Sequence, residues 1–549
     1  MINILDYINF YFNNFIKVDR NNKKKHDKKH DKKHDKKHDK KHDKKHDKNH
    51  DVKHDKKKYK CIDDNKEHCR SSESSESSES SKSKITYCET LYFTDYNSLI
   101  NYNLPSKTSS YINIITNINN FSSLIENDPL RGVNGIVYAM VADVIKGILY
   151  IGGQFTSAGS INASYIVSYN SKTGIFTPLI DSVTGKEGTN NNVLSLALDT
   201  VNSKLYLGGE FTKVGETITA SRIACWDILN SKFLPLTDTI TLGEGADDAV
   251  RCLALNSNNS KLYLGGEISS VGGTIVVKYI ASWNILTNTF SALTDTITSL
   301  EGTDSSVYSL IYDSVNSKLC IGGAFTNVGG TIQANYVAFW NVVTNTFSAL
   351  IDTDTLINGT NSSVYSLAYN PINNTLYVGG SFDLAGGKMN QWITSYKINN
   401  SSWICLEAGI QKIDDVLNPI VNTLCLDIVN QILYVGGNYL QTSGINTNNV
   451  SVYNINNNLW SPLTENKGRY NGITNGYGFN NVLLVKSIYK LNNFLFIGGN
   501  FNMGGNIQVN NITKVKLNYI LNTDRSKIYI NNTSTILKYN SSTNKWIII

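Results

Sequence analysis

Residues Lys204 to Glu210 read KLYLGGE, and related versions of this stretch recur along the chain. Adjacent glycines occur in each version, at residues 152–153, 208–209, 265–266, 322–323, 379–380, 436–437 and 498–499, so successive pairs are 56, 57, 57, 57, 57 and 62 residues apart. A strand-rich unit repeated at roughly 40 to 50 residues or slightly more is typical of a propeller. The 549-residue chain is therefore predicted to be one large repeat domain with an N-terminal tail.

The repeated unit is clearest from residue 306 to residue 350, where four strand-like segments read VYSLIYD, KLCIGGAFT, YVAFWNV and TFSAL. Four such segments per repeat predict an all-β propeller of about seven four-stranded blades, with eight blades as the alternative. Residues 111–125 and 526–549 resemble partial blades. We therefore expect strands from both ends of the chain to complete one blade, because this closure removes the exposed sheet edge.

Polar residues recur at two fixed places before the glycine pairs. An Asp or Asn lies nine residues before each of the first six pairs, and an Asn lies six residues before most pairs, as at Asn202 and Asn316. Asx side chains accept hydrogen bonds from nearby backbone N–H groups, so these positions are predicted to build hairpin turns rather than to catalyse a reaction. The glycines themselves are predicted to lie where blades crowd together or where a strand bulges.

Aromatic residues also recur, in the third and fourth strand of each unit. Pairs such as Trp283 with Phe290 and Trp340 with Phe347 supply large apolar surfaces. We interpret these aromatics as the core between stacked sheets.

Two features together resemble the kelch motif: a double glycine at the end of the second strand, and an aromatic pair flanking a turn, as in WNILTNTF at residues 283–290. The longer form GGAFTNVGGT, at residues 322–331, is similar to the repeats of cortical cell-polarity marker proteins, a kelch-like propeller family. The resemblance implies a kelch-like propeller over residues 101–549, and it implies a binding platform whose partners are diverse. Galactose oxidase shares this fold but requires copper-ligating histidines, whereas all nine histidines of this chain lie at or before His68.

The N-terminal hundred residues divide into three segments. Residues 1–22 place apolar side chains at helical spacing, which predicts a short amphipathic helix or a weakly ordered terminus. Residues 61–100 are predicted to be a Ser- and Glu-rich linker.

Between them, residues 23–60 repeat the unit KKHD and are predicted to be disordered, because they contain almost no apolar side chain. This segment holds 19 lysines and 8 aspartates, a local charge of +11 that leaves −5 for the rest of the chain. Contact with a polyanion is one function open to it. Metal binding is a weaker one, through imidazoles spaced by four residues: His26, His30, His34, His38, His42, His46, His50 and His54.

Several features bear on the compartment. No stretch reaches the roughly 18 apolar residues of a transmembrane helix, and the first twenty residues lack the marks of a secretory signal. The cysteines within the repeats occupy different repeat positions, which favours reduced thiols over a disulfide framework. These observations predict an intracellular, cytoplasmic protein. The AT-rich codon bias implied by the many Asn, Ile, Lys and Tyr residues adds a virus-encoded, virion-associated protein as an alternative.

Function remains open between two classes. The absence of histidine after His68 removes the commonest proton carrier, so we expect a non-enzymatic interaction scaffold without cofactor or catalytic residues. The alternative is a carbohydrate-active propeller that uses loop carboxylates such as Asp247, Asp248, Glu301 and Asp304. For the scaffold, we expect an unknown protein partner to bind the loops between blades, with Arg469, Tyr470 and Tyr477 of the longest loop as contacts.

Overall fold

The computed structural model describes residues 121–125, 128–256, 260–406, 409–412, 418–463, 472–474 and 484–517, together with the backbone of six further strands. Those strands are Thr90–Phe93 (β1), Asn113–Thr116 (β2), Ile520–Asp524 (β47), Lys527–Ile530 (β48), Thr535–Asn540 (β49) and Lys545–Ile548 (β50). The predictions for residues 1–22, for residues 23–60 and, apart from β1, for the Ser- and Glu-rich linker lie outside the described residues, and so do the eight tail histidines, Arg469, Tyr470 and Tyr477. All elements of the described residues are strands, so this part of the chain contains no helix suited to crossing a membrane.

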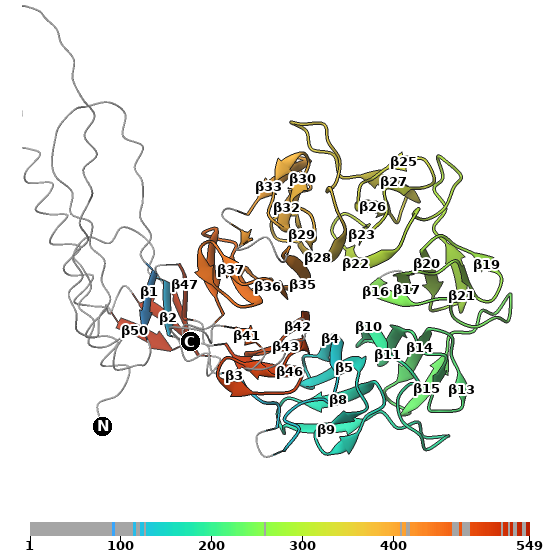
Figure 1. Cartoon of the computed structure of the whole chain (residues 1–549), viewed down its shortest axis with the longest axis horizontal. Coiled ribbons are helices and arrows are strands. Elements are labelled where there is room, and N and C mark those ends of the chain that lie inside the picture. Colours follow the sequence, from blue (N-terminus) through green and yellow to red (C-terminus); the bar gives the residue numbers. More distant parts are fainter. Residues whose placement is uncertain are drawn as a thin grey trace, which may run out of the picture.

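Seven four-stranded antiparallel sheets form a ring, which confirms the predicted number of blades (Figure 1). The first four blades contain β4 (Ile136–Asp143), β5 (Ile148–Gln154), β8 (Ile166–Asn170) and β9 (Ile175–Pro178); β10 (Val193–Asp199), β11 (Lys204–Gly209), β14 (Ile223–Asp227) and β15 (Lys232–Pro235); β16 (Val250–Asn256), β17 (Lys261–Gly266), β20 (Ile280–Asn284) and β21 (Thr289–Ala292); and β22 (Val307–Asp313), β23 (Lys318–Gly323), β26 (Val337–Asn341) and β27 (Thr346–Ala349).

The other three blades repeat this arrangement. They contain β28 (Val364–Asn370), β29 (Thr375–Gly380), β32 (Ile393–Lys397) and β33 (Ser402–Cys405); β35 (Ile420–Asp427), β36 (Ile432–Asn438), β39 (Val450–Asn454) and β40 (Leu459–Pro462); and β42 (Leu484–Leu491), β43 (Phe494–Asn500), β46 (Ile512–Lys516) and β3 (Phe121–Ser122). The first strand of each blade contacts the first strand of the next, so these seven strands surround the axis of the ring (Figure 1).

A small hairpin lies between the second and third strand of each blade. The seven hairpins are β6 (Ser157–Ala158) with β7 (Ile161–Asn162), β12 (Lys213–Val214) with β13 (Ile218–Thr219), β18 (Ser270–Val271) with β19 (Ile275–Val276), β24 (Asn327–Val328) with β25 (Ile332–Gln333), β30 (Leu384–Ala385) with β31 (Lys388–Met389), β37 (Gln441–Thr442) with β38 (Ile445–Asn446), and β44 (Met503–Gly504) with β45 (Ile507–Gln508). The last two hairpins each gain a third strand, β34 (Ile410–Gln411) and β41 (Ile473–Thr474) respectively.

The ring closes in its seventh blade, where the two ends of the propeller meet. Strand β3 pairs with β46 through Phe121 opposite Val515 and Ser122 opposite Lys514. One outer strand from the N-terminal side thus completes three strands from the C-terminal side, as the sequence predicts. Residues 526–549 take no part in this closure, because β47 to β50 form a sheet of their own outside the ring (Figure 1).

The two glycines of each pair have different tasks. A Cβ on the first glycine would meet a valine of the following blade, 2.6 Å from Val364 Cγ1 in the case of Gly322. The same contact occurs at all seven junctions, and it ends with Gly498 against Val137 of the first blade. A Cβ on the second glycine would instead meet a backbone carbonyl of its own blade, such as Ser306 O at 2.2 Å from Gly323. The predicted crowding between blades is therefore confirmed. A bulge is present as well, but it lies in the first strand opposite the glycines, as between Val307 and Ser309, and not in the glycine strand itself.

Aromatic pairs fill the space between blades, as predicted. Trp283 and Phe290 have ring centroids 4.5 Å apart, and Trp340 and Phe347 lie 4.6 Å apart. All four side chains are buried. Among the described residues, Cys225, Cys252, Cys320 and Cys425 form no disulfide bond, in line with the expected free thiols.

Asx turns join the first and second strands, as predicted. Asp199 Oδ1 accepts hydrogen bonds from the N–H groups of Val201 and Asn202, and Asp313 Oδ1 accepts them from Val315 and Asn316. These repeated carboxylates are buried and hold turns.

Candidate functional site

The antiparallel connections give the ring two different faces. The turns from first to second strand and from third to fourth strand lie at one end of every blade, which we call the turn face. The small hairpins and the long loops between blades lie at the other end, which we call the loop face. Isolated bridges join each long loop to a hairpin there, as between Thr189 and Val214 or Ala246 and Val271. The loops on this face are thus held by backbone pairing.

A β-bulge occurs at the same place in the first strand of all seven blades, close to the loop face. Where the first strand pairs with the second, one residue of the first strand has no partner, and it directly follows a valine that occupies this position in every blade. In the second blade the extra residue lies between Val193 and Ser195. A bulge re-aims the side chain of its extra residue and is frequent beside functional sites. The extra residues, which we call the bulge ring, are Tyr138, Leu194, Arg251, Tyr308, Tyr365, Asn422 and Lys486.

The bulge ring combines a constant backbone with variable side chains. Each of its residues is partly exposed, and each follows a fully buried valine that packs on the neighbouring blade's glycine. Tyr308 and Tyr365 of adjacent blades have ring centroids 5.5 Å apart. The side-chain N–H₂ of Asn422 has no hydrogen-bond partner among the described residues. This ring therefore offers cationic, aromatic and amide groups to one small region.

Electrostatic coupling indicates that members of the bulge ring converge. Burial lowers the pKa of Lys486, and the positive charge of Arg251 lowers it further although it belongs to a non-adjacent blade. Burial and then Glu210 raise the pKa of Tyr138, while Arg251 partly offsets them. Arg251 thus acts on bulge-ring residues of two other blades, and the first strands that carry them surround the axis of the ring.

Two acidic side chains border the bulge ring and moderate its charge. Arg251 donates to Glu267 Oε1 through Nη2 at 2.8 Å and through Nε at 3.0 Å. Glu210 accepts a hydrogen bond from Asn192 Nδ2 at 2.8 Å. Lys486 has no such carboxylate partner among the residues that the structure describes.

The loop carboxylates proposed for an enzyme have structural tasks instead. Asp247 Oδ1 accepts hydrogen bonds from the N–H groups of Ser269 and Ser270. Asp304 Oδ1 accepts them from Thr326 and Asn327 in the equivalent place of the next blade. Burial opposes ionisation, but these hydrogen bonds outweigh it and lower the pKa of both carboxyls. A glycosidase acid needs a raised pKa, so neither residue suits that role.

The other two proposed carboxylates lie on the same loops. Asp248 Oδ1 accepts from the adjacent Ala249 N–H at 2.7 Å, and Glu301 forms a backbone bridge with Thr294. Within the described ranges, no three His, Cys, Asp or Glu side chains are placed to hold a metal ion.

A second set of aspartates, which the sequence analysis did not single out, links neighbouring blades. Asp181, Asp238, Asp295 and Asp352 follow the fourth strand of one blade and are fully buried. One carboxylate oxygen caps the local turn, and the other accepts the N–H of a fourth-strand aromatic in the following blade: Phe233, Phe290, Phe347 or Trp403, at 2.6 to 2.8 Å. These aspartates could have been recognised from the sequence, because the triplet LTD or LID recurs every 57 residues.

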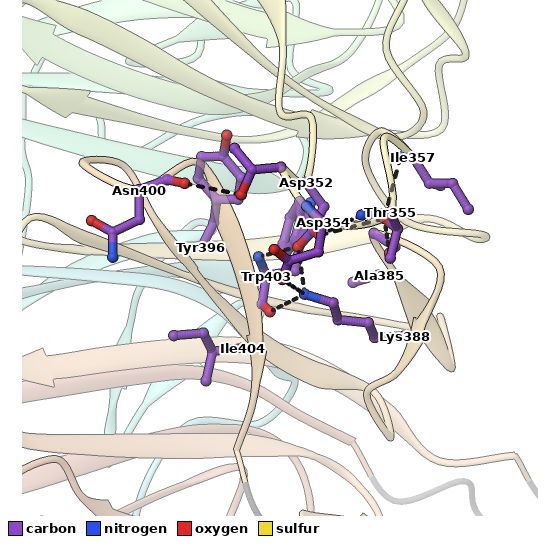
Figure 2. A network of polar contacts seen from close by, with 12 residues as sticks. Asp352, Asp354, Thr355, Ile357, Ala385, Lys388, Tyr396, Asn400, Trp403 and Ile404 are labelled. Atoms are coloured by element: carbon purple, nitrogen blue, oxygen red, sulfur yellow. Dashed lines mark hydrogen bonds and ion pairs between the residues drawn. The ribbon is translucent and has the colours of Figure 1, made fainter.

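Figure 2 shows the hydrogen bonds of Asp352, which include an ion pair with a lysine. Lys388 Nζ lies 2.8 Å from Asp352 Oδ2 and 3.2 Å from Asp354 Oδ2, and it also donates to Trp403 O at 3.4 Å. Burial raises the pKa of Asp352, but hydrogen bonds from Lys388 and from the N–H groups of Trp403, Thr355 and Asp354 overcome this effect and lower it to about 2. The Asp352 carboxylate is thus held by a structural network, whereas the Asp354 side chain is 74% exposed and its carboxylate pairs with Lys388.

The long loops give the loop face an acidic character. Loops 236–249, 293–306 and 350–363 contain nine Asp or Glu residues and no Lys or Arg. The residues named for partner binding from the sequence, Arg469, Tyr470 and Tyr477, lie outside the described residues, so their role stays a prediction. The bulge ring is not marked by one recurring residue type, because its seven positions hold five different types.

Comparison with known proteins links part of the chain to one propeller family. Residues 337–412 match the family model described as Rax2 C-terminal beta propeller domain. The polarized growth protein RAX2 of Candida albicans is 27% identical over 215 residues, which cover 37% of this chain and 15% of that relative's length. The matched part agrees with the resemblance to cell-polarity marker repeats.

Solved structures with a similar arrangement include two propellers. The chains titled Structure of U3-55K and Crystal structure of RRP9 WD40 repeats each superpose with a TM-score of 0.44 at 13% identity. The alignments cover 71% and 72% of this chain, and 97% and 100% of those chains.

Proposed function

We propose that the propeller is a non-catalytic scaffold that binds a macromolecular partner on its loop face, centred on the bulge ring. The bulge ring is the observation that carries this proposal. Seven identical backbone positions hold five different side-chain types, whereas the flanking valines and glycines are constant. A variable, partly exposed position beside constant buried ones suits recognition, and tyrosine and arginine are enriched among residues that dominate binding energy.

The charge of the loop face suggests the chemistry of the partner. Five carboxylates of these loops are neither fully buried nor paired with Lys388: Glu244, Asp247, Asp248, Glu301 and Asp304. They favour a basic surface on the partner, since complementary charge increases the association rate. Lys486 and Arg251 at the centre would then receive an acidic or carbonyl group at the middle of a basic surface. The name of the matched relative supports a scaffold role connected with polarized growth, and a cytoplasmic location remains part of this proposal.

Affinity capture with the full chain tests this function. We expect the double substitution Tyr308→Ala with Lys486→Ala, and separately Arg469→Ala with Tyr470→Ala, to abolish capture of the partner without lowering the melting temperature. The matched control is Lys172→Ala on the turn face, which should leave capture unchanged. A glycan-hydrolysis reaction that disappears with Asp247→Ala, while neither double substitution affects any capture, would favour the carbohydrate-active alternative.

A further inference from the structure

The turn face carries exposed aliphatic side chains at the tips of its inner turns. In five blades the turn between first and second strand presents Ile or Val with 60% to 89% of its surface exposed: Ile145, Val201, Val315, Ile372 and Val429. Hydrogen bonds to Asx side chains fix the backbone of these turns. For example, Asp199 Oδ1 accepts the N–H of Val201 at 3.1 Å. Exposed aliphatic groups on rigid turns are thus a repeated feature of this face.

The outer turns of blades two, three and four present a second set. Leu229, Leu286 and Val343 are 75% to 78% exposed. Each donates its backbone N–H to an Asx side chain two residues earlier, and Lys172 and Asn456 occupy the same turn position in other blades. Polar residues are therefore compatible with this turn, so its folding does not require the aliphatic side chains of the three blades.

Neighbouring loop tips extend this apolar region. Val183, Ile240 and Ile297 are 70% to 80% exposed. The residue before each one donates its N–H to the outer turn of the following blade, as Thr239 does to Asn288 O at 2.9 Å and Thr296 to Asn345 O at 2.9 Å. Blades two to four therefore each carry an aliphatic pair at the outer edge of the turn face, one from the loop and one from the turn.

Lysines accompany these apolar tips. Eight border the turns of this face: Lys146, Lys172, Lys204, Lys232, Lys261, Lys318, Lys397 and Lys490. The five acidic residues of the same turns, Asp143, Asp199, Asp227, Asp313 and Asp427, are all buried. Lys146, Lys204 and Lys490 form ion pairs with Asp143, Asp227 and Asp427. The exposed Asp354 occupies the loop position equivalent to Ile240 and Ile297 and pairs with Lys388. The positive charge that remains on the turn face comes from the other five lysines, of which Lys172 and Lys232 are exposed.

We propose that the turn face docks on the surface of an anionic lipid bilayer. The tips belong to equivalent turns of a ring, so they reach a common plane, which matches a flat surface. They are separate from one another, and a bilayer can accept each one individually, whereas a protein partner would need a matching pocket for each. Aliphatic tips that enter the headgroup region and lysines that meet lipid phosphates or carboxylates are the two components of interfacial binding. Docking in this way would present the loop face to its partner.

Vesicle flotation with the full chain tests the proposal. The probe is phosphatidylcholine vesicles with phosphatidylserine, compared with phosphatidylcholine alone, at physiological salt. The basic segment 23–60 is present in the wild type and in every variant, so differences between them report on the turn face. Wild-type protein should float with the anionic vesicles. The triple variant Leu229→Asn, Leu286→Asn, Val343→Asn should bind about tenfold or more weakly, because it removes three apolar groups that would leave water.

A matched variant on the opposite face serves as control. Val276→Asn, Met389→Asn, Leu440→Asn also replaces three exposed apolar residues and should bind vesicles like wild type. Unchanged melting temperatures would show that both variants fold. Failure of the wild type to float, equal binding by the turn-face variant, or equal loss in the control would overturn the proposal. It would also be overturned if the turn-face variant lost a protein ligand but retained vesicle binding.

Discussion

At the scale of single residues, the fold depends on glycine positions where the Cβ of any other residue would be too close to neighbouring atoms. The first glycine of each pair lies against a valine of the next blade, so the close approach of neighbouring sheets is repeated at every junction around the ring. At Gly322 the surroundings are simple, because the nearest atoms to an added Cβ belong to Val364 and Leu367. Packing at this junction can therefore be tested with a pair of small substitutions.

We predict that Gly322→Ala lowers the free energy of unfolding by about 1 to 3 kcal/mol, the usual cost of overfilling a packed interior. Denaturant titration measures this change. Val364→Ala removes the contacting Cγ1, so the double variant should lose less stability than the sum of the two single variants. Additive losses would show that the glycine is required for another reason.

At the scale of elements, buried aspartates tie the outer strand of one blade to the loop of the preceding one. One carboxylate oxygen holds the turn in its own loop, and the other accepts a backbone N–H from the next sheet. A single side chain therefore both shapes the loop and joins two blades. Asp352 is the best place to test this link, since its pKa is lowered to about 2.

We predict that Asp352→Asn destabilises the protein near neutral pH by about 1.5 to 3 kcal/mol, the value of hydrogen bonds to a charged group. The folded-state pKa lies below the ordinary aspartate value of about 3.9, so the ionised carboxylate contributes stability above that value and loses it as the pH falls toward 2. Melting temperatures measured from pH 6 to about pH 2 should therefore fall less steeply for the variant than for wild type.

The neighbouring Asp354 provides the control. Its side chain is 74% exposed and it contacts only Lys388 in the same network. Asp354→Asn should change the melting temperature and its pH dependence little, because exposed ion pairs contribute little stability. Equal effects of the two substitutions would contradict a special role for the buried carboxylate.

At the scale of the whole molecule, ring closure depends on a strand of two residues. Phe121 of β3 is buried in the core of the seventh blade, in contact distance of Gly504 and Gly505 of a small hairpin. The strand also covers the edge of β46, which would otherwise expose unpaired backbone groups. The two described strands before β3, β1 and β2, pair with each other and add no strand to the ring.

We predict that a protein beginning at residue 118 folds with a melting temperature close to that of the full chain, whereas one beginning at residue 126 is strongly destabilised. Loss of the Phe121 side chain alone should cost about 3 to 5 kcal/mol. Limited proteolysis gives an independent measurement: we expect a resistant fragment that begins near residue 85 to 110 and retains β3. Rapid cleavage through the repeats, or full stability without β3, would contradict this view of closure.

The sequence by itself determined the all-β propeller, its seven blades, the Asx turns, the aromatic core and the crowding between blades at the paired glycines. These features can be predicted because each depends on a local spacing that recurs about every 57 residues. Each repeat has the same structural requirement, so the same residue types appear at the same positions several times.

Only the tertiary structure decided which residues meet across blades. Asp352 acts on Trp403 of the next blade, Gly498 packs on Val137 across the closed ring, and β3 rather than residues 526–549 completes the last sheet. The bulge ring and the opposite charges of the two faces were equally hidden, since their members are distant in sequence and differ from blade to blade. The physical reason is that local pattern specifies how a strand or turn forms, whereas contacts between distant residues exist only after the ring has closed.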